Sequence, residues 1–373
     1  MKQKFLYLAM AAMAMASCSQ DETIDVYKGK GIGFRTETPA GTRALETTTA
    51  NITEFWASAF LSEGGYQHFD PHTRFFKKDG FFTSYPEQQW PGDDKELTFY
   101  AISPEPKDLT GATLTLNTTA QKLENFTVAN TFIAQQDLIY ATATAKESDS
   151  EDGSVSLTFD HMLSQIEVKA MANDDCGYNF EVKGVRLGAI PSTSTLTNFT
   201  TKTWEAATTP VTYNEISNGV IILNSTAQSV MPQIEVNGSM VNDNAMLIPQ
   251  QLVAWDRVSG DMKNEKKGAY IGVLVKITTK EGNVQIYPKK EGVTHGYACV
   301  PIDTKWEAGK HYVYTLDFSD GAGFVDPEKP DPDPTDPDKP GEEILGGGLK
   351  FKVTVTDWIT PEDDSSLGIE KDF

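Results

Sequence analysis

The five histidines are the first residues to test for chemistry, because imidazole is a common acid–base catalyst and metal ligand. They are scattered through the chain, at His68, His72, His161, His295 and His311. His68 and His72 lie close together, but their context lacks the spacing of a zinc-binding helix. The sequence shows no nucleophile elbow, phosphate-binding loop or dinucleotide fingerprint. We therefore predict that the protein is not an enzyme and has no catalytic residues, metal or cofactor.

Six tryptophans are the second candidates, because an exposed indole ring can stack against a sugar. They are Trp56, Trp90, Trp204, Trp255, Trp306 and Trp358. Each adjoins strand-like or turn sequence, where burial in a core is the commoner fate of this side chain. Several tryptophans on one exposed face would favour a glycan-binding surface instead.

Two arginines lie close together near the N-terminus, in GIGFRTETPAGTRALETTTA, residues 31–50, although the whole chain holds only five. Arg43 stands among small residues typical of a loop, and loop tips are where proteolytic cleavage concentrates. Arg35 adjoins Ile32 and Phe34, which read as a strand, and strands inside sheets resist cleavage. Arg43 is thus either an ordinary loop residue or a protease site, with Arg35 the weaker candidate.

The N-terminus reads as an export signal. Lys2 and Lys4 precede an apolar run, residues 5–16, that is too short to span a bilayer. Small residues then lead to Cys18, and MAMASC resembles a bacterial lipoprotein signal. We predict removal of residues 1–17, lipidation of Cys18 and tethering to a membrane through lipid. An ordinary signal peptide with a chance cysteine is the alternative.

The net charge is −21, from 53 acidic and 32 basic residues. This charge argues against nucleic acid or an anionic membrane surface as a partner. The other two cysteines, Cys176 and Cys299, are too few for a cysteine-rich zinc site. They can pair in an oxidising compartment, but we favour free, partly buried thiols.

Alternation of apolar and polar residues dominates the chain and predicts an all-β protein of antiparallel sandwiches or barrels. No long amphipathic helix is predicted, and residues 51–62 read either as a short helix or as a strand. The clearest alternating segments are VSLTF (155–159), IEVKA (166–170), YIGVLVKIT (270–278), HYVYTLDF (311–318) and FKVTVTDW (351–358).

An acidic, proline-rich segment, 326–348, opens with DPEKPDPDPTDPDKPGEE. Its composition predicts an extended, solvated spacer and lacks the glycine turns of a calcium loop. A strand, 349–358, follows it. At polyproline rise the first 18 residues of this spacer, 326–343, reach roughly 50 Å, so this strand could pair far from Phe318, on another molecule. Folding back as an edge strand of its own domain is the alternative.

Six phrases together resemble the fimbrillin family, the outer-membrane lipoproteins and pilins of Bacteroides-type bacteria, and they follow the family's order behind the lipoprotein start. They are IGFRTETPAGTRA (32–44), QWPGDDKELTFYAISP (89–104), VSLTFDHMLSQIEVKA (155–170), MLIPQQL (246–252), WEAGKHYVYTLDF (306–318) and FKVTVTDW (351–358). The resemblance implies two tandem Greek-key β-sandwich domains of transthyretin-like topology. We place them at 18–172 and 173–373.

The resemblance also implies a mode of assembly. A lipoprotein precursor anchored at Cys18 crosses the periplasm to the outer membrane and is cut by an Arg-specific protease after Arg43. The cut releases the leading strand with Ile32 and Phe34, and the strand of a neighbouring fimbrial subunit fills the vacated groove. The candidate donor is 349–358, with Phe351, Val353, Val355 and Trp358.

The expected function is a structural pilus subunit or tip adhesin of a fimbrium at the cell surface, with a receptor or glycan on a host or bacterial surface as a further partner. Two alternatives stay open, a fimbrial anchor subunit that keeps its lipid and a glycan-binding surface lipoprotein. The long acidic spacer departs from a compact stalk pilin, so the sequence leaves the position in the pilus open.

Overall fold

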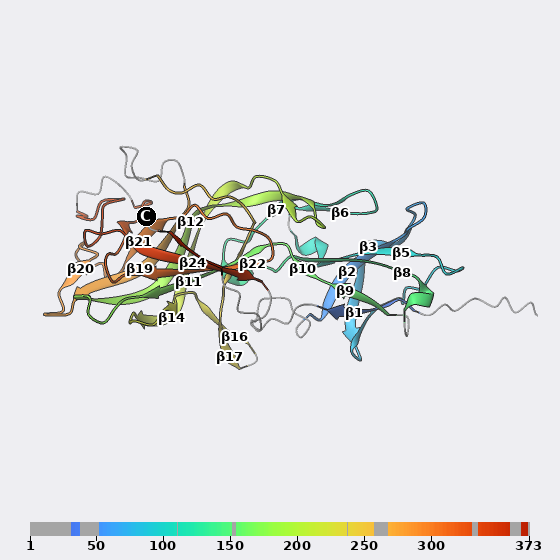
Figure 1. Ribbon diagram of the computed structural model, residues 1–373, viewed down its shortest axis with the longest axis horizontal. Helices are drawn as coiled ribbons and strands as arrows, with labels where there is room; N and C mark the ends of the chain where they lie inside the picture. Colours follow the sequence, from blue (N-terminus) through green and yellow to red (C-terminus); the bar gives the residue numbers. More distant parts are fainter. Residues whose placement is uncertain are drawn as a thin grey trace, which may run out of the picture.

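Strands are the main secondary structure of the described residues, and they form two units end to end in an elongated molecule (Figure 1). The computed structural model describes residues 31–37, 52–109, 111–150, 154–236, 238–256, 268–329, 335–358 and 367–371. In these residues the helical elements are three single turns of 3-10 helix, η1 (Pro106–Asp108), η2 (Phe132–Ala134) and η3 (Glu147–Asp149). The prediction of an all-β protein is confirmed. No helix in the described parts has the length and hydropathy needed to cross a bilayer.

The N-terminal sheet has eight strands in the described residues, in the spatial order β10-β8-β5-β2-β3-β4-β1-β9. The strands are β1 (Gly33–Glu37), β2 (Glu54–Leu61), β3 (Gln67–Lys78), β4 (Phe81–Ser84), β5 (Leu97–Ser103), β8 (Ile139–Ala145), β9 (Ser154–Thr158) and β10 (Asp160–His161). The strand predicted at 155–159 is present as β9, and the segment 51–62, which the sequence left open between a helix and a strand, contains β2.

Strand β2 is buried on both faces, which explains its ambiguous sequence. Phe55 and Ala57 face a cluster rich in phenylalanine, and Trp56 and Phe60 face the second, larger core. A strand covered on both sides reads as a continuous apolar run instead of an alternating one. The run FWASAFL is therefore a strand, and the helical reading of 51–62 is wrong for these residues.

The C-terminal unit is a sandwich of two sheets. In the described residues, the β22 sheet runs β15-β11-β22-β24-β25, with β18 beside β11, and the β12 sheet runs β23-β21-β19-β12-β7-β6, with β13, β14 and β20 at its sides. The first comprises β11 (Ser164–Met171), β15 (Gln228–Ser229), β18 (Ala245–Leu247), β22 (Lys310–Asp317), β24 (Lys350–Asp357) and β25 (Leu367–Lys371).

The β12 sheet is built around one strand of 21 residues, β12. This strand pairs with β7, which precedes it in the chain, and with β19, which follows it. Its members are β6 (Thr113–Leu116), β7 (Gln121–Thr127), β12 (Tyr178–Asn198), β13 (Thr203–Trp204), β14 (Thr208–Ile222), β19 (Tyr270–Thr279), β20 (Gln285–Tyr287), β21 (Gly296–Pro301) and β23 (Phe324–Val325). A separate hairpin, β16 (Gln233–Val236) and β17 (Ser239–Asn242), projects from the unit (Figure 1).

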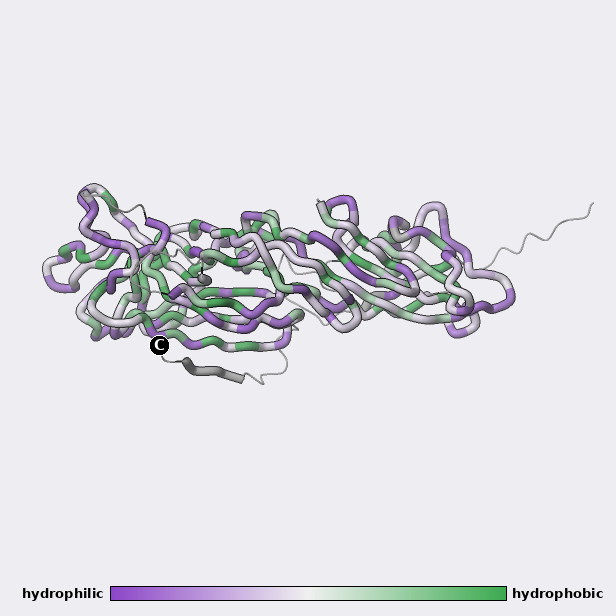
Figure 2. Tube along the Cα trace, turned by 90° about the horizontal axis from the view of Figure 1, so that it is seen from above, coloured by the Kyte–Doolittle hydropathy of each residue, from purple (hydrophilic) through white to green (hydrophobic). Residues whose placement is uncertain are grey.

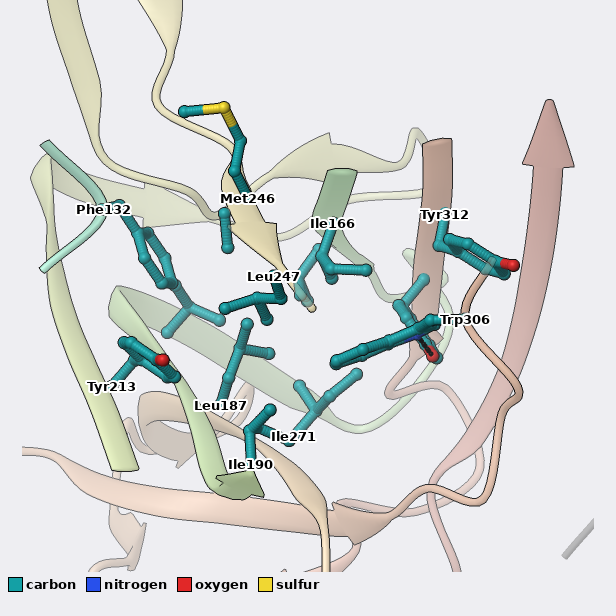
Figure 3. Close-up of a cluster of buried hydrophobic side chains, with 14 of the residues drawn as sticks. Phe132, Ile166, Leu187, Ile190, Tyr213, Met246, Leu247, Ile271, Trp306 and Tyr312 are labelled. Carbon is teal, nitrogen blue, oxygen red and sulfur yellow. Dashed lines mark hydrogen bonds between the residues drawn. The ribbon is translucent and has the colours of Figure 1, made fainter. Parts of the chain in front are cut away.

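The core of the sandwich lies between these two sheets. Figure 3 shows Ile166 of the β22 sheet facing Leu187 and Ile271 of the β12 sheet, with Trp306 beside them. Hydrophobic and hydrophilic residues alternate along many of the strands (Figure 2). The alternating residues predicted in 166–170, 270–278 and 311–318 are all buried in this core.

The chain leaves the N-terminal sheet earlier than predicted. It passes from β10 to β11 between His161 and Ser164, and β11 pairs with β22 and β18. Strands β6 and β7 also belong to the β12 sheet, although they precede β8 in sequence. The boundary near residue 172 is therefore wrong, because the alternating pattern of 164–171 does not show which sheet the strand joins. Greek-key topology of the transthyretin type stays a prediction.

The acidic segment is packed against the C-terminal unit. Asp336 and Asp338 are buried, and Lys329 Nζ lies 2.6 Å from Asp336 Oδ2. The backbone N–H of Lys289 donates to Asp338 Oδ2 over 2.7 Å, and Arg186 Nη1 of β12 lies 2.7 Å from Asp326 Oδ2. The prediction of an extended, solvated spacer is therefore wrong for residues 326–329 and 335–348. Its acidic residues pair with lysines inside the segment and with basic groups of the sandwich.

The thiols of Cys176 and Cys299 are free, as predicted; the first is half-buried and the second buried. Burial raises the pKa of the Cys299 thiol well above its ordinary value, so this thiol is held protonated and unreactive.

Asp243 is a buried acid that should make stability depend on pH. Burial, with a smaller contribution from nearby Glu215, raises its pKa to about 6. The ordinary value is about 4, so the folded chain binds more protons than the unfolded chain between these values, and stability falls as pH rises through this window. We expect Asp243→Asn to stabilise the protein by on the order of 1 kcal/mol at pH 7.5 and to have little effect at pH 4.

Urea unfolding of both proteins at the two pH values measures this difference. The matched control is Asp93→Asn, at an exposed position of the N-terminal unit, which should change neither value. An equal shift at both pH values would show that the carboxylate charge is not the cause.

Candidate functional site

The first strand is bound in the N-terminal sheet by few backbone contacts. β1 pairs in parallel with β9 over five residues, but with β4 at a single antiparallel pair, Phe34 opposite Phe82. Just before the strand, the backbone N–H of Ile32 donates to the carbonyl of Gln88 over 2.7 Å. β1 thus covers the edges of two strands that lie far from it in sequence.

The side chains of this strand fill the centre of the phenylalanine-rich core. Phe34 is fully buried, and its ring lies edge-on to the rings of Phe75, Phe99 and Phe55, at centroid distances of 4.7, 5.2 and 5.5 Å. Ile32 is buried on the same face, two residues earlier. Removal of β1 would therefore open a groove lined by phenylalanine rings, as the sequence predicts for a displaced leading strand.

The outward face of β1 carries Arg35. Its side chain is exposed, and its guanidinium carbon lies 4.9 Å from the centre of the Phe81 ring. Because its backbone belongs to a paired strand, Arg35 is a poor protease site in the folded chain, in agreement with its lower rank in the sequence. Cys18 and Arg43 lie outside the residues that the structure describes, so both stay predictions.

The candidate donor strand lies inside its own C-terminal unit. β24 is antiparallel to β22 over eight residue pairs, with Leu316 opposite Phe351. Phe351, Val353 and Trp358 are buried and Val355 is half-buried. In the single chain, the expectation that the segment 326–348 carries this strand far from Phe318 is therefore wrong. The alternative, in which the strand folds back into its own domain, is correct for this chain. The strand is an inner strand and not the predicted edge strand, because β25 lies beyond β24 in the sheet.

The edge position belongs to β25, which the sequence reasoning missed. Its backbone pairs with β24 from Phe351 opposite Lys371 to Val355 opposite Leu367, and it is the last strand of the β22 sheet. A signal for it was available in the sequence. Leu367-Gly368-Ile369 repeats the apolar-glycine-apolar order of Ile32-Gly33-Phe34, and a charged residue follows in both.

The tryptophans do not form a sugar-stacking surface. All six lie in described residues; five are buried, and Trp204 is half-buried. Trp204 and Trp306 line a cavity of about 730 Å³, but their indole N–H groups already donate to Met162 O and Tyr314 Oη, over 3.0 and 2.9 Å. The glycan-binding alternative thus loses the exposed tryptophans on which it depended.

Comparison with known proteins identifies the family. Residues 38–358 match the model of a family described as fimbrillin-like. The chain belongs to the fimbrillin-like family. The resemblance seen in its sequence is thereby confirmed, and the match spans both units of this fimbrillin-like chain, from the segment after β1 to Trp358.

Two relatives of this fimbrillin-like chain are informative. The fimbrium subunit Fim1C of Phocaeicola vulgatus is 27% identical over 246 residues, which cover 57% of this chain and 64% of that protein. The chain thus spans less than two thirds of that relative. The crystal structure of a fimbrial protein from Bacteroides vulgatus has a TM-score of 0.57 at 16% identity, covering 88% of this chain and 99% of the other. At 16% identity, this similarity shows that the two chains share a fold.

We predict that Phe34 is the main stabilising residue of β1. Phe34→Ala leaves a cavity among three aromatic rings and should destabilise the N-terminal unit by roughly 3–5 kcal/mol. Arg35→Ala, on the exposed face of the same strand, should cost less than about 1 kcal/mol. Urea unfolding of the two variants and the parent measures both values, and equal costs would show that β1 is not held by its buried face.

Proposed function

We propose that this protein is a subunit of a fimbrium at the cell surface and that subunits assemble by exchange of a β-strand. The observation that carries the proposal is β1, a five-residue strand whose buried Phe34, with Ile32 just before the strand, fills a groove between β4 and β9. The family and the fimbrium subunit among the relatives support the same function. The role is structural, with other subunits as partners, and needs no catalytic residue.

Cleavage after Arg43 is the step that would make exchange favourable. In the uncut chain β1 is tethered to its groove, and a tethered segment competes at an effective concentration in the millimolar range. After the cut, the piece with Cys18, Ile32 and Phe34 is a separate peptide that dissociates and dilutes. An Arg-specific protease would thus release the subunit from its lipid anchor at the outer membrane and open the groove at the same time.

The last strand, β25, is the better donor of the two terminal strands. Extraction of β24 would expose Tyr312 and Tyr314 of β22 and remove Phe351 and Val353 from the core. Among the described strands, β25 pairs with β24 alone, so detaching β25 breaks that one pairing. Its residues 367–369 also match the pattern of the strand that it would replace. We therefore assign donation to β25 and retain β24 as the strand that carries it, with Trp358 at its end.

The test uses the exported chain without residues 1–17, treated with an Arg-specific protease. We expect a new N-terminus at Ala44 and a ladder of multimers on a gel. Arg43→Ala should give neither. Ile369→Asp, which replaces an apolar residue of β25 with a charged one, should be cut but remain monomeric, whereas Glu370→Gln, at the next position, should still assemble.

A peptide of residues 31–37 should slow assembly of the cut subunit, and the same peptide with Phe34 replaced by Asp should not. Cleavage without multimers would contradict the assembly function. Multimers formed by Ile369→Asp would show that β25 is not the donor.

A further inference from the structure

An aromatic stack joins the N-terminal sheet to the end of β24. The imidazole of His161, in β10, lies flat against the indole of Trp358, with ring centroids 4.1 Å apart and an interplanar angle of 10°. Both side chains are buried, and the backbone N–H of Trp358 donates to Gly309 O over 2.7 Å. The stack lies where the N-terminal sheet and the β22 sheet meet, in the middle of the elongated molecule (Figure 1).

His161 is held in place by contacts with its own N-terminal unit. Its Nδ1 lies 3.0 Å from a carboxylate oxygen of Asp137, which is itself buried. Its backbone pairs with Ile139 of β8. The position of the imidazole therefore depends on β10 and on the segment that leads into β8. Trp358 is the last described residue before β25, so the stack fixes the point from which the chain continues to its last strand.

The route from the stack back to β1 is short. β9 ends at Thr158, three residues before His161, and β1 is the only strand that pairs with β9 in the described residues. Between them Phe159 lies in the same phenylalanine-rich core as Phe34, with its ring 5.3 Å from that of Phe55. β10 pairs with β8 through only two residues. Loss of β1 would thus leave β9 unpaired and weaken the support of His161.

We propose that the His161–Trp358 stack is a lock that couples the first strand to the last. While β1 fills its groove, β9 and β10 hold His161 against Trp358, and β24 and β25 stay docked in the β22 sheet. When β1 leaves, His161 loses its support and the end of β24 loosens. This inference rests on the proposed function for its purpose: a subunit would release its donor strand only after its own groove has opened.

Such coupling requires an element with two arrangements that both sites bias. Here that element is the pair of rings, stacked or separated. One ring belongs to the sheet that β1 completes, and the other to the strand that precedes β25. Stacked aromatic rings at such distances stabilise a fold by more than their buried area alone provides. Separating the two rings therefore raises the population of molecules in which β24 and β25 are undocked from the β22 sheet.

Hydrogen–deuterium exchange of the uncut chain tests the lock without any assembly step. The observable is exchange of the amides of β24 and β25. Phe34→Asp, which drives β1 from its groove, should raise this exchange roughly tenfold, as expected for loss of one buried aromatic contact. Arg35→Ala, on the exposed face of β1, should leave it unchanged. The amides of β2 must stay protected, which shows that the N-terminal sheet remains folded.

The second arm breaks the lock directly. His161→Ala should raise the exchange of β24 and β25 by itself, and adding Phe34→Asp should then raise it little further. Trp358→Leu retains apolar volume without leaving Asp137 unpaired, and it should behave in the same way. His311→Ala is the control; it changes a histidine of β22 opposite Thr356 of β24, and in this variant Phe34→Asp should still raise exchange.

Unchanged exchange in Phe34→Asp, or additive effects in the double variants, would overturn the lock. The outcome is separate from that of the proposed function. Coupling in the uncut chain with no multimers after cleavage would retain the lock and reject strand exchange. Multimers after cleavage, with no coupling in the uncut chain, would retain strand exchange and reject the lock.

Discussion

The burial of Phe34 among three phenylalanine rings is the interaction on which the rest of the N-terminal unit depends. The face of β2 that carries Phe55 and Ala57 requires apolar cover, as does the inner face of β3, and β1 supplies the central part of it. The same five residues also provide the only strand that pairs with β9 in the described residues. One short segment therefore completes a core and a sheet edge together, so its removal creates an apolar groove and an unpaired strand at once.

The same need for cover arranges the C-terminal end. β22 presents Tyr312, Tyr314 and Leu316 to the core, and β24 completes that face with Phe351 and Val353. β25 then covers the outer edge of β24. In the β22 sheet, the strand whose departure would expose least apolar surface is the outermost one, β25. In the N-terminal sheet, the proposed cleavage after Arg43 would release β1. Strand exchange as proposed would thus use one terminal strand from each unit.

Patterns local to one strand were predictable from the sequence. Alternation in 270–278 and 311–318 located two strands and their buried faces, and the resemblance located Ile32 and Phe34. Pairing between distant segments was not predictable. IEVKA has the same period as VSLTF, yet the two join different sheets, so the boundary near 172 was wrong. Composition misled at 326–348 because counting charges does not reveal that Asp336 and Asp338 meet lysines. β25 was missed because it has only two alternating apolar residues, Leu367 and Ile369, where VSLTF has three.

The size of β1 also limits how strand exchange can operate. Burial of Ile32 and Phe34 contributes roughly 1.5–3 kcal/mol each, while the net gain of its backbone hydrogen bonds and the entropy lost on ordering five residues are of similar size. A micromolar complex requires about 8 kcal/mol. The cut strand would therefore dissociate readily, which suits exchange.

The same estimate of binding free energy applies to β25, which would bring two apolar residues, Leu367 and Ile369, into the groove of a neighbouring subunit. Its insertion alone cannot hold two subunits together at micromolar concentration, so a stable joint by this route requires contact outside the groove. Tyr85 stands where such contact would form. It follows β4, lies in the turn before the Gln88 carbonyl that anchors the start of β1, and is 92% exposed. An aromatic side chain left open beside a groove of this kind adds the contact area that the strand lacks.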